Sequence, residues 1–254
     1  MNLIKDKLKK FAVYGSGLIG NNSLKSVAQV ITGNIATTLI SLVASILVAR
    51  WTLPYNMGVW NAASLATIYM PVLQLGVFSG LNRELPYLLG TGNKAKALSM
   101  AQAAYAWSFV LIAFSAIATF IIAFYFWVKG NHNLSYTVIA IGITVTCSWA
   151  SLYYGTTYRT HSEFGRLAKN NTIVAFIGIA LTLFVFYFGY GGILIRASLL
   201  AIFGVVALYY RRPMPVQPLW NKALFVQMVK VGVPIWLVGQ LGTCLLYTSD
   251  AADE

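Results

Sequence analysis

Residues 97–128, with the sequence ALSMAQAAYAWSFVLIAFSAIATFIIAFYFWV, form a long apolar stretch without a single charged side chain. About 20 apolar residues in a helix cross the hydrocarbon core of a bilayer, so this stretch is long enough to span it and to tilt or extend beyond it. The stretch lacks the ten-residue alternation of apolar and polar residues that is typical of outer-membrane barrel strands. It therefore predicts a transmembrane α-helix.

The rest of the chain repeats this pattern. Of its 254 residues, 58% are hydrophobic and 9% are charged, whereas a soluble domain has roughly 25% charged residues. We expect complete membrane spans at 27–49, 59–80, 97–128, 135–155, 172–190 and about 192–209, and the start of a seventh at Val231. Pro71 predicts a kink in the second span. The sequence thus predicts an all-α, polytopic integral membrane helix bundle.

The distribution of charge predicts the orientation of the bundle. The chain has 18 Lys and Arg residues against 6 Asp and Glu. With the N-terminus in the cytoplasm, fifteen basic residues fall in the inner segments and only Arg50 and Lys129 in the outer ones. This is the positive-inside pattern of a membrane protein. Since the bases lie in short gaps between apolar runs and form no patch on a polar fold, we expect no nucleic-acid partner.

Two basic segments flank the predicted six-span lobe at 27–210. Residues 1–26 are either an amphipathic segment on the cytoplasmic membrane surface or a frayed basic tail. Residues 211–230 contain three prolines, which stop the sixth helix. We interpret this segment as a cytoplasmic linker and a surface helix between two lobes, so that 231–243 begins the seventh span.

The last eleven residues, 244–254, change composition in the middle of an apolar run and include three acids. They resemble the translation of a transposon-type sequencing adapter, and a short natural polar tail is the alternative. We expect an artefact, because spans rarely change composition in mid-helix. On this interpretation the chain is a fragment that stops early in its seventh span.

The sequence contains no pattern typical of an enzyme. No HExxH, GxSxG, P-loop or CxxC motif occurs, and the predicted outer loops are too short to build a catalytic site. His132 and His161 are single loop histidines, for which solvation is the simplest interpretation. We therefore expect no catalytic activity, no metal site and no cofactor.

Three arginines are candidates for contact with a substrate. Arg196 is the clear case of a charge inside a span; its side chain either extends to the outer interface or faces a cavity as an anion site. Arg83, at the inner end of the second span, either binds a phosphate with its planar guanidinium, pairs with Glu84, or anchors the helix on the cytoplasmic side. Arg50 ends the first span at the outer face.

Five stretches resemble one known family: ARWTLPYNMG at 49–58, LGVFSGLNRELPY at 75–87, GTGNKAK at 90–96, FGRL at 164–167 and KVGVP at 230–234. The resemblance is to the polysaccharide biosynthesis and O-antigen flippase family of the multidrug/oligosaccharidyl-lipid/polysaccharide exporter superfamily. It covers nearly all of residues 25–243. It identifies the branch of the superfamily better than it identifies the substrate.

The resemblance implies a transporter with two six-helix lobes, of which this chain supplies the N-terminal one, in a bacterial inner membrane. It implies that cationic residues, here Arg50, Arg83 and Arg196, line a central cavity that receives a lipid-linked oligosaccharide, an undecaprenyl-pyrophosphate glycan. Membrane lipid and other envelope-polysaccharide assembly proteins would be the partners. A cation-coupled multidrug exporter and a non-catalytic subunit of a glycan-assembly complex are the alternatives.

Overall fold

A computed structural model describes the backbone of residues 21–250 and the side chains of residues 31–240. The elements in this part of the chain are α2 (Asn21–Trp51), α3 (Pro54–Tyr69), the 3-10 helix η1 (Met70–Gln74), α4 (Val77–Gly90), α5 (Lys94–Val128), α6 (His132–Thr160), α7 (Phe164–Phe188), α8 (Tyr190–Tyr210) and α9 (Lys222–Asp250). None of them is a strand, which confirms the predicted all-α fold. The proposed N-terminal surface segment falls mainly outside the described residues, as do the side chains of 244–254.

The helices are those of a multi-pass membrane protein. Six of the described helices, namely α2 and α5 to α9, are long and apolar enough to cross a membrane. The bent pair of α3–η1 and α4 adds a seventh span if it is counted as one. Large apolar side chains such as Phe120, Ile121 and Phe186 are exposed on the surface of the bundle. Such surfaces are rare on soluble monomers and are suited to contact with lipid.

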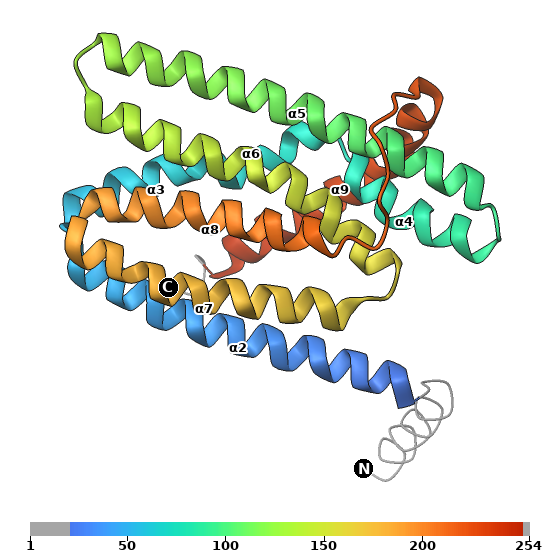
Figure 1. Cartoon of the computed structure of the whole chain (residues 1–254). Coiled ribbons are helices and arrows are strands. Elements are labelled where there is room, and N and C mark those ends of the chain that lie inside the picture. The colour runs from blue at the N-terminus through green and yellow to red at the C-terminus, as the bar shows by residue number, and fades with distance from the viewer. Residues whose placement is uncertain (1–20, 251–254) are drawn as a thin grey trace.

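Helices α5, α6, α7 and α8 run in alternating directions (Figure 1), whereas α3 and α4 continue one another as a bent pair. Helix α5 packs along α6, α6 along α8, α8 along α7 and α7 along α2. The connections 91–93, 161–163 and 211–221 therefore lie at one end of the bundle, which we call the basic end. Its basic residues are Lys94, Lys96, Arg159, Arg166, Lys169, Arg211, Arg212 and Lys222, whereas Arg50 and Lys129 belong to the opposite end. The uneven charge seen in the sequence thus separates the two ends of the fold.

Local sequence explains where several helices begin. The side chains of Asn93, Asn131 and Asn221 each accept a hydrogen bond from a backbone N–H of the first turn of α5, α6 and α9, as asparagine caps do. Pro54 occupies the first turn of α3, where a missing N–H is harmless. Gly189 alone separates α7 from α8 and has a φ of 55°, which favours glycine.

The second span is more strongly bent than the sequence predicts. The two parts, Pro54–Gln74 and Val77–Gly90, meet at an angle of 53°. The kink expected at Pro71 is present as the 3-10 turn η1, but the chain changes direction at Leu75 and Gly76, which have left-handed φ angles of 52° and 72°. The simple span predicted at 59–80 is therefore wrong in its bounds, because a non-helical break falls inside it.

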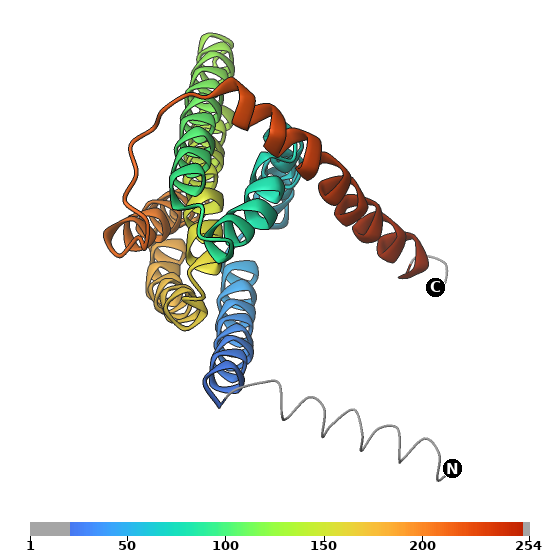
Figure 2. The same cartoon turned by 90° about the vertical axis from the view of Figure 1, so that its right-hand side faces the viewer.

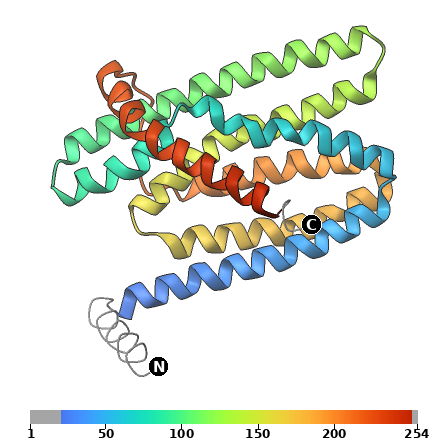
Figure 3. The ribbon, with the colours of Figure 1, turned by 180° about the vertical axis from the view of Figure 1, so that it is seen from behind.

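The last helix also differs from its prediction. Helix α9 begins at Lys222 and continues through Val231 without a break, so residues 222–230 are not a separate surface helix. Only residues 211–221, with their prolines, form a non-helical connection, and this segment lies against α5 through Leu219 N–H and the carbonyl of Gln102 at 3.4 Å. Helix α9 then runs obliquely across the bundle, as Figures 2 and 3 show.

Two apolar clusters hold the helices together. The larger one lies in the half of the bundle next to the basic end and centres on the fully buried Trp149, Tyr153, Leu81 and Leu85 of α4 and α6. The smaller one lies toward the opposite end and joins Val48, Val185 and Ile193 of α2, α7 and α8. Polar side chains gather in the space between α2, α6, α7 and α8.

Candidate functional site

A partly open cavity of about 370 Å³, lined by both apolar and polar side chains, lies between α2, α6, α7 and α8. Helix α2 contributes two hydroxyl side chains, α6 one, α7 two adjacent amides, and α8 an arginine. The polar residues of the lining are Thr37, Ser41, Ser151, Asn170, Asn171 and Arg196. The cavity therefore gathers hydrogen-bonding groups from four membrane-spanning helices, of which the side chains of Ser41 and Asn171 are exposed.

A second cavity, of about 340 Å³, adjoins the first between α6 and α8. Ser151, Arg196 and Leu200 line both cavities, so the arginine stands where the two meet. The remaining lining of the second cavity includes the polar side chains of Thr144, Cys147 and Ser148. Together the two cavities place one cation among hydroxyl, amide and thiol groups.

The side chain of Arg196 is fixed against α7. Its Nε donates hydrogen bonds to the carbonyl of Gly178 and to Oγ1 of Thr182, both at 3.2 Å. The Thr182 hydroxyl is buried and itself donates to the Gly178 carbonyl at 2.8 Å. Arg196 follows the start of α8 by six residues, or about 9 Å of helix. The structure therefore places this side chain in the cavity lining, the second of the two positions considered from the sequence.

The charge of Arg196 has no acidic partner among the described side chains. The only ion pair there joins Arg166 to Glu163, at 2.8 Å on the surface. The guanidinium uses Nε for its protein contacts, and its two terminal nitrogens make no hydrogen bond to the described residues. A cation at this depth is costly unless water or an anion compensates it. The two terminal nitrogens can donate hydrogen bonds to an anionic group that enters the cavity.

The rest of the lining suits a hydroxyl-rich ligand. Asparagine amides both donate and accept hydrogen bonds, and so do the hydroxyls of Thr37 and Ser41. No carboxylate lines either cavity, so an anion meets no repulsion from the lining. Asn170 follows the exposed Lys169 and lies in the part of α7 nearest the basic end.

The structure does not bring the three candidate arginines together. Arg50 is exposed in the last turn of α2, and Arg83 is exposed on α4; neither lines the two cavities. The pairing of Arg83 with Glu84 is wrong, because no ion pair joins them among the described residues. Instead, Oε2 of Glu84 accepts a hydrogen bond from Nε2 of Gln227 at 3.2 Å. Glu84 thus connects α4 to α9.

Sequence reasoning missed Asn170, Asn171 and Ser151. The asparagines lie just before the span predicted at 172–190, but α7 begins at Phe164 and includes both, and both line the first cavity. Two adjacent amides beside an apolar run were a usable signal. Ser151 lay inside a predicted span without a signal of its own, because serine is common at helix contacts in membranes.

Among the described residues, no group of three or more His, Cys, Asp or Glu side chains could hold a metal ion. The chain matches no protein-family model, no curated protein and no solved structure.

Proposed function

We propose that this chain belongs to a membrane transporter that translocates a lipid-linked oligosaccharide, an undecaprenyl-pyrophosphate glycan, across the bacterial inner membrane for cell-surface polysaccharide biosynthesis. One observation carries the proposal. Arg196 lies inside the membrane-spanning part of the bundle without an acidic partner among the described residues, and borders two polar cavities.

The chemistry of the headgroup fits this site. A guanidinium binds phosphate oxygens through two parallel, charge-assisted hydrogen bonds, and the terminal nitrogens of Arg196 are available for them. Sugar hydroxyls require partners that donate and accept, which the asparagines and hydroxyls supply. Without such partners each polar group that enters hydrocarbon costs several kcal/mol. Sheltering the headgroup is sufficient for transport, and no covalent step is needed.

The proposal assigns the other two arginines to the route of the headgroup. Arg83 is exposed on α4, where it would capture pyrophosphate at the cytoplasmic mouth, while Arg50 would lie near the exit at the opposite end. In the full-length protein, we expect Arg83→Ala to reduce glycan export without reducing the amount of protein in the membrane. Arg83→Lys should restore export only in part, because lysine lacks the planar fork. Full export by the alanine variant would remove Arg83 from the route.

The orientation follows from the positive-inside rule. We propose that the basic end faces the cytoplasm. Cysteines that replace Lys94 and Lys129 test this, since the two residues lie at opposite ends of α5. An impermeant thiol reagent applied from outside should label position 129 and leave position 94 unlabelled. The reverse pattern would mean that the proposed orientation is wrong.

The alternative of a cation-coupled multidrug exporter finds less support in the cavities. Coupling to a cation calls for a carboxylate in the transport path, and neither cavity lining contains one. A non-catalytic subunit of a glycan-assembly complex would not require a cation bordering an internal polar cavity.

The test is glycan export by the full-length two-lobe transporter to which we assign this chain, in a strain that lacks its own flippase. Arg196→Gln removes the charge but keeps a polar side chain, and we expect export to fall at least about tenfold, the effect of losing one hydrogen bond to a charged group. Arg196→Lys should retain part of the export. Lys129→Gln, which removes an exposed charge, is the matched control. Normal export by Arg196→Gln at normal abundance would refute the proposal.

A further inference from the structure

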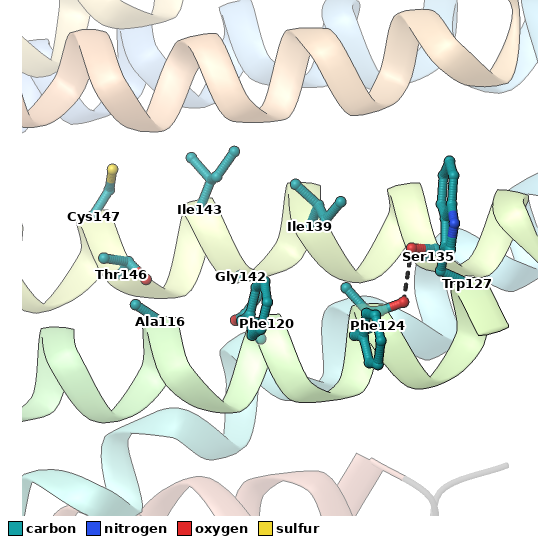
Figure 4. Close-up of a pocket in the computed structure, with 12 residues that line it drawn as sticks. Ala116, Phe120, Phe124, Trp127, Ser135, Ile139, Gly142, Ile143, Thr146 and Cys147 are labelled. Carbon is teal, nitrogen blue, oxygen red and sulfur yellow. Dashed lines mark hydrogen bonds between the residues drawn. The ribbon is translucent and has the colours of Figure 1, made fainter.

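An apolar groove of about 620 Å³ lies between α5 and α6. Figure 4 shows the residues along it, among them Phe120 and Phe124 of α5 and Ile139 and Ile143 of α6. The groove extends from the middle of α6 to Trp127, in the half of the bundle away from the basic end. It therefore lies within the membrane-spanning part of both helices.

The few hydroxyls of the groove are already satisfied by the protein. Ser135 donates to the carbonyl of Ala123 at 2.9 Å, as the dashed line in Figure 4 marks, and Thr119 donates to the carbonyl of Ser115 at 2.7 Å. In contrast, Phe120 and Phe124 are 71% and 59% exposed. The groove thus presents an apolar surface to its occupant.

The groove and the polar cavities that Arg196 borders, which together we call the Arg196 cavity, share a single residue. Cys147 lines the groove and also the second polar cavity, in which Arg196 stands. Ile139, Ile143 and Cys147 are spaced by four residues and extend to the same side of α6 (Figure 4). The next residue of this row, Ser151, lines both polar cavities. One face of α6 therefore changes from apolar to polar along its length.

We infer that the groove and the Arg196 cavity form one binding site, in which Arg196 holds the phosphate of the transported lipid and the α5–α6 groove holds its polyprenyl chain. The inference rests on the proposed function and names the place of the chain. This groove lies beside a cavity that contains the cation Arg196. A long apolar groove next to one positive charge is complementary to a lipid with an apolar chain and an anionic headgroup.

The direction of the groove agrees with loading from the basic end. From Cys147 the groove extends over twelve residues of α6 to Ser135, or about 18 Å, away from the basic end. A lipid of the leaflet on that side has its headgroup toward the basic end and its chain toward the middle of the bilayer. Such a lipid could move from the leaflet into the site with its headgroup still directed toward the basic end, so it need not turn over on entry.

Photo-crosslinking tests the inference. The purified protein in phosphatidylcholine vesicles is mixed with a polyprenyl phosphate that carries a diazirine in its chain, or with a phosphatidylglycerol labelled in the same way. We expect the polyprenyl probe to label α5 and α6 around the groove. Ile139→Trp, which fills the groove, should lower this labelling about fivefold, the effect of losing several carbon–carbon contacts. Arg196→Gln should lower it as well.

Ile117→Trp is the matched control, because Ile117 lies on α5 outside the groove and is 61% exposed; its labelling should equal that of the wild type. Labelling spread evenly over all helices, or unchanged by Ile139→Trp, would overturn the inference. Equal labelling of the groove by phosphatidylglycerol would show that its occupant is an ordinary phospholipid and would overturn it too. Loss of export in Arg196→Gln without groove labelling would refute this inference alone and leave the proposed function standing.

Discussion

The α4–α9 contact at Gly80 and the part of the α7–α8 contact around Gly178 differ in how closely the second helix approaches, although α7 and α8 also touch closely near their turn, where an added Cβ at Gly192 would collide with the backbone of Phe184. At Gly80 of α4 an added Cβ would collide with the backbone of Met228 on α9. At Gly178 of α7 an added Cβ would lie 3.4 Å from Leu200 and 3.9 Å from the guanidinium of Arg196, which is ordinary contact. The first glycine permits two backbones to touch, whereas the second leaves room beside a cavity.

This difference indicates that some helix contacts stabilise the bundle by close packing, whereas others leave space for a cavity. Lipid chains are as apolar as the helices, so membrane helices associate mainly through close packing. The α4–α9 contact achieves this with Gly76, Gly80 and Gly232 and with the fully buried Met228. Around Gly178 the helices leave space, and polar side chains border it. A binding site requires this looser arrangement.

The largest expected effect is on the tight contact. Gly80→Ala should push α9 away from α4, at a cost of about 1–3 kcal/mol for overpacking. Glu84 and Gln227 are hydrogen-bonded to each other in the wild type. When both are replaced by cysteine, a thiol cross-linker should join α4 to α9 less efficiently in the Gly80→Ala background than without it. The thermal midpoint of the detergent-solubilised protein should also fall.

Gly90→Ala is the control for this experiment, since Gly90 is also on α4 but has no atom within 4 Å of an added Cβ. It should leave cross-linking and the thermal midpoint unchanged. Equal cross-linking in the Gly80 and Gly90 variants would mean that α4 and α9 are not held by close packing.

Sequence alone predicted most of the fold because hydrophobic length is a local property. The apolar runs give the membrane helices, and the basic residues between them separate the two ends. The glycines at 76 and 80 are also visible as a small-residue motif, but nothing local shows that their partner is Gly232, more than 150 residues later. The bend at Leu75 was missed because leucine does not favour a left-handed φ angle.

The candidate site was predicted only in part, for the same reason. Arg196 was evident, because a charge within an apolar run is costly. Its anchors, Gly178 and Thr182, are ordinary residues of a membrane helix and become significant only once α7 and α8 lie side by side. The cavity depends on the rotation of four helices about their axes, and no single helix sequence determines that rotation.

A moderate effect is expected at the anchor of Arg196. Thr182→Val keeps the shape of the side chain but removes the hydroxyl that Nε of Arg196 contacts. Hydrogen bonds between membrane helices average about 0.6 kcal/mol, so substrate affinity should fall about threefold. The measurement is glycan export at limiting substrate, with Thr67→Val as the control, since the Thr67 hydroxyl donates to the carbonyl of Ser64 on its own helix and lines neither polar cavity. An effect as large as that of Arg196→Gln would show that the anchor is essential to the site.

The smallest effect is expected from the same substitution that is most damaging at position 80. Gly178→Ala adds a methyl group at ordinary contact distance from Leu200 and the Arg196 guanidinium, and alanine favours the helix by up to about 1 kcal/mol over glycine. The thermal midpoint should therefore stay the same or rise, and export should change by less than about twofold, which is less than the expected effect of Thr182→Val. If Gly178→Ala instead lowers the thermal midpoint as much as Gly80→Ala does, the space beside α7 is already filled by close packing. Arg196 would then be a structural link between α7 and α8, and the division between a tight contact and a binding cavity would be lost.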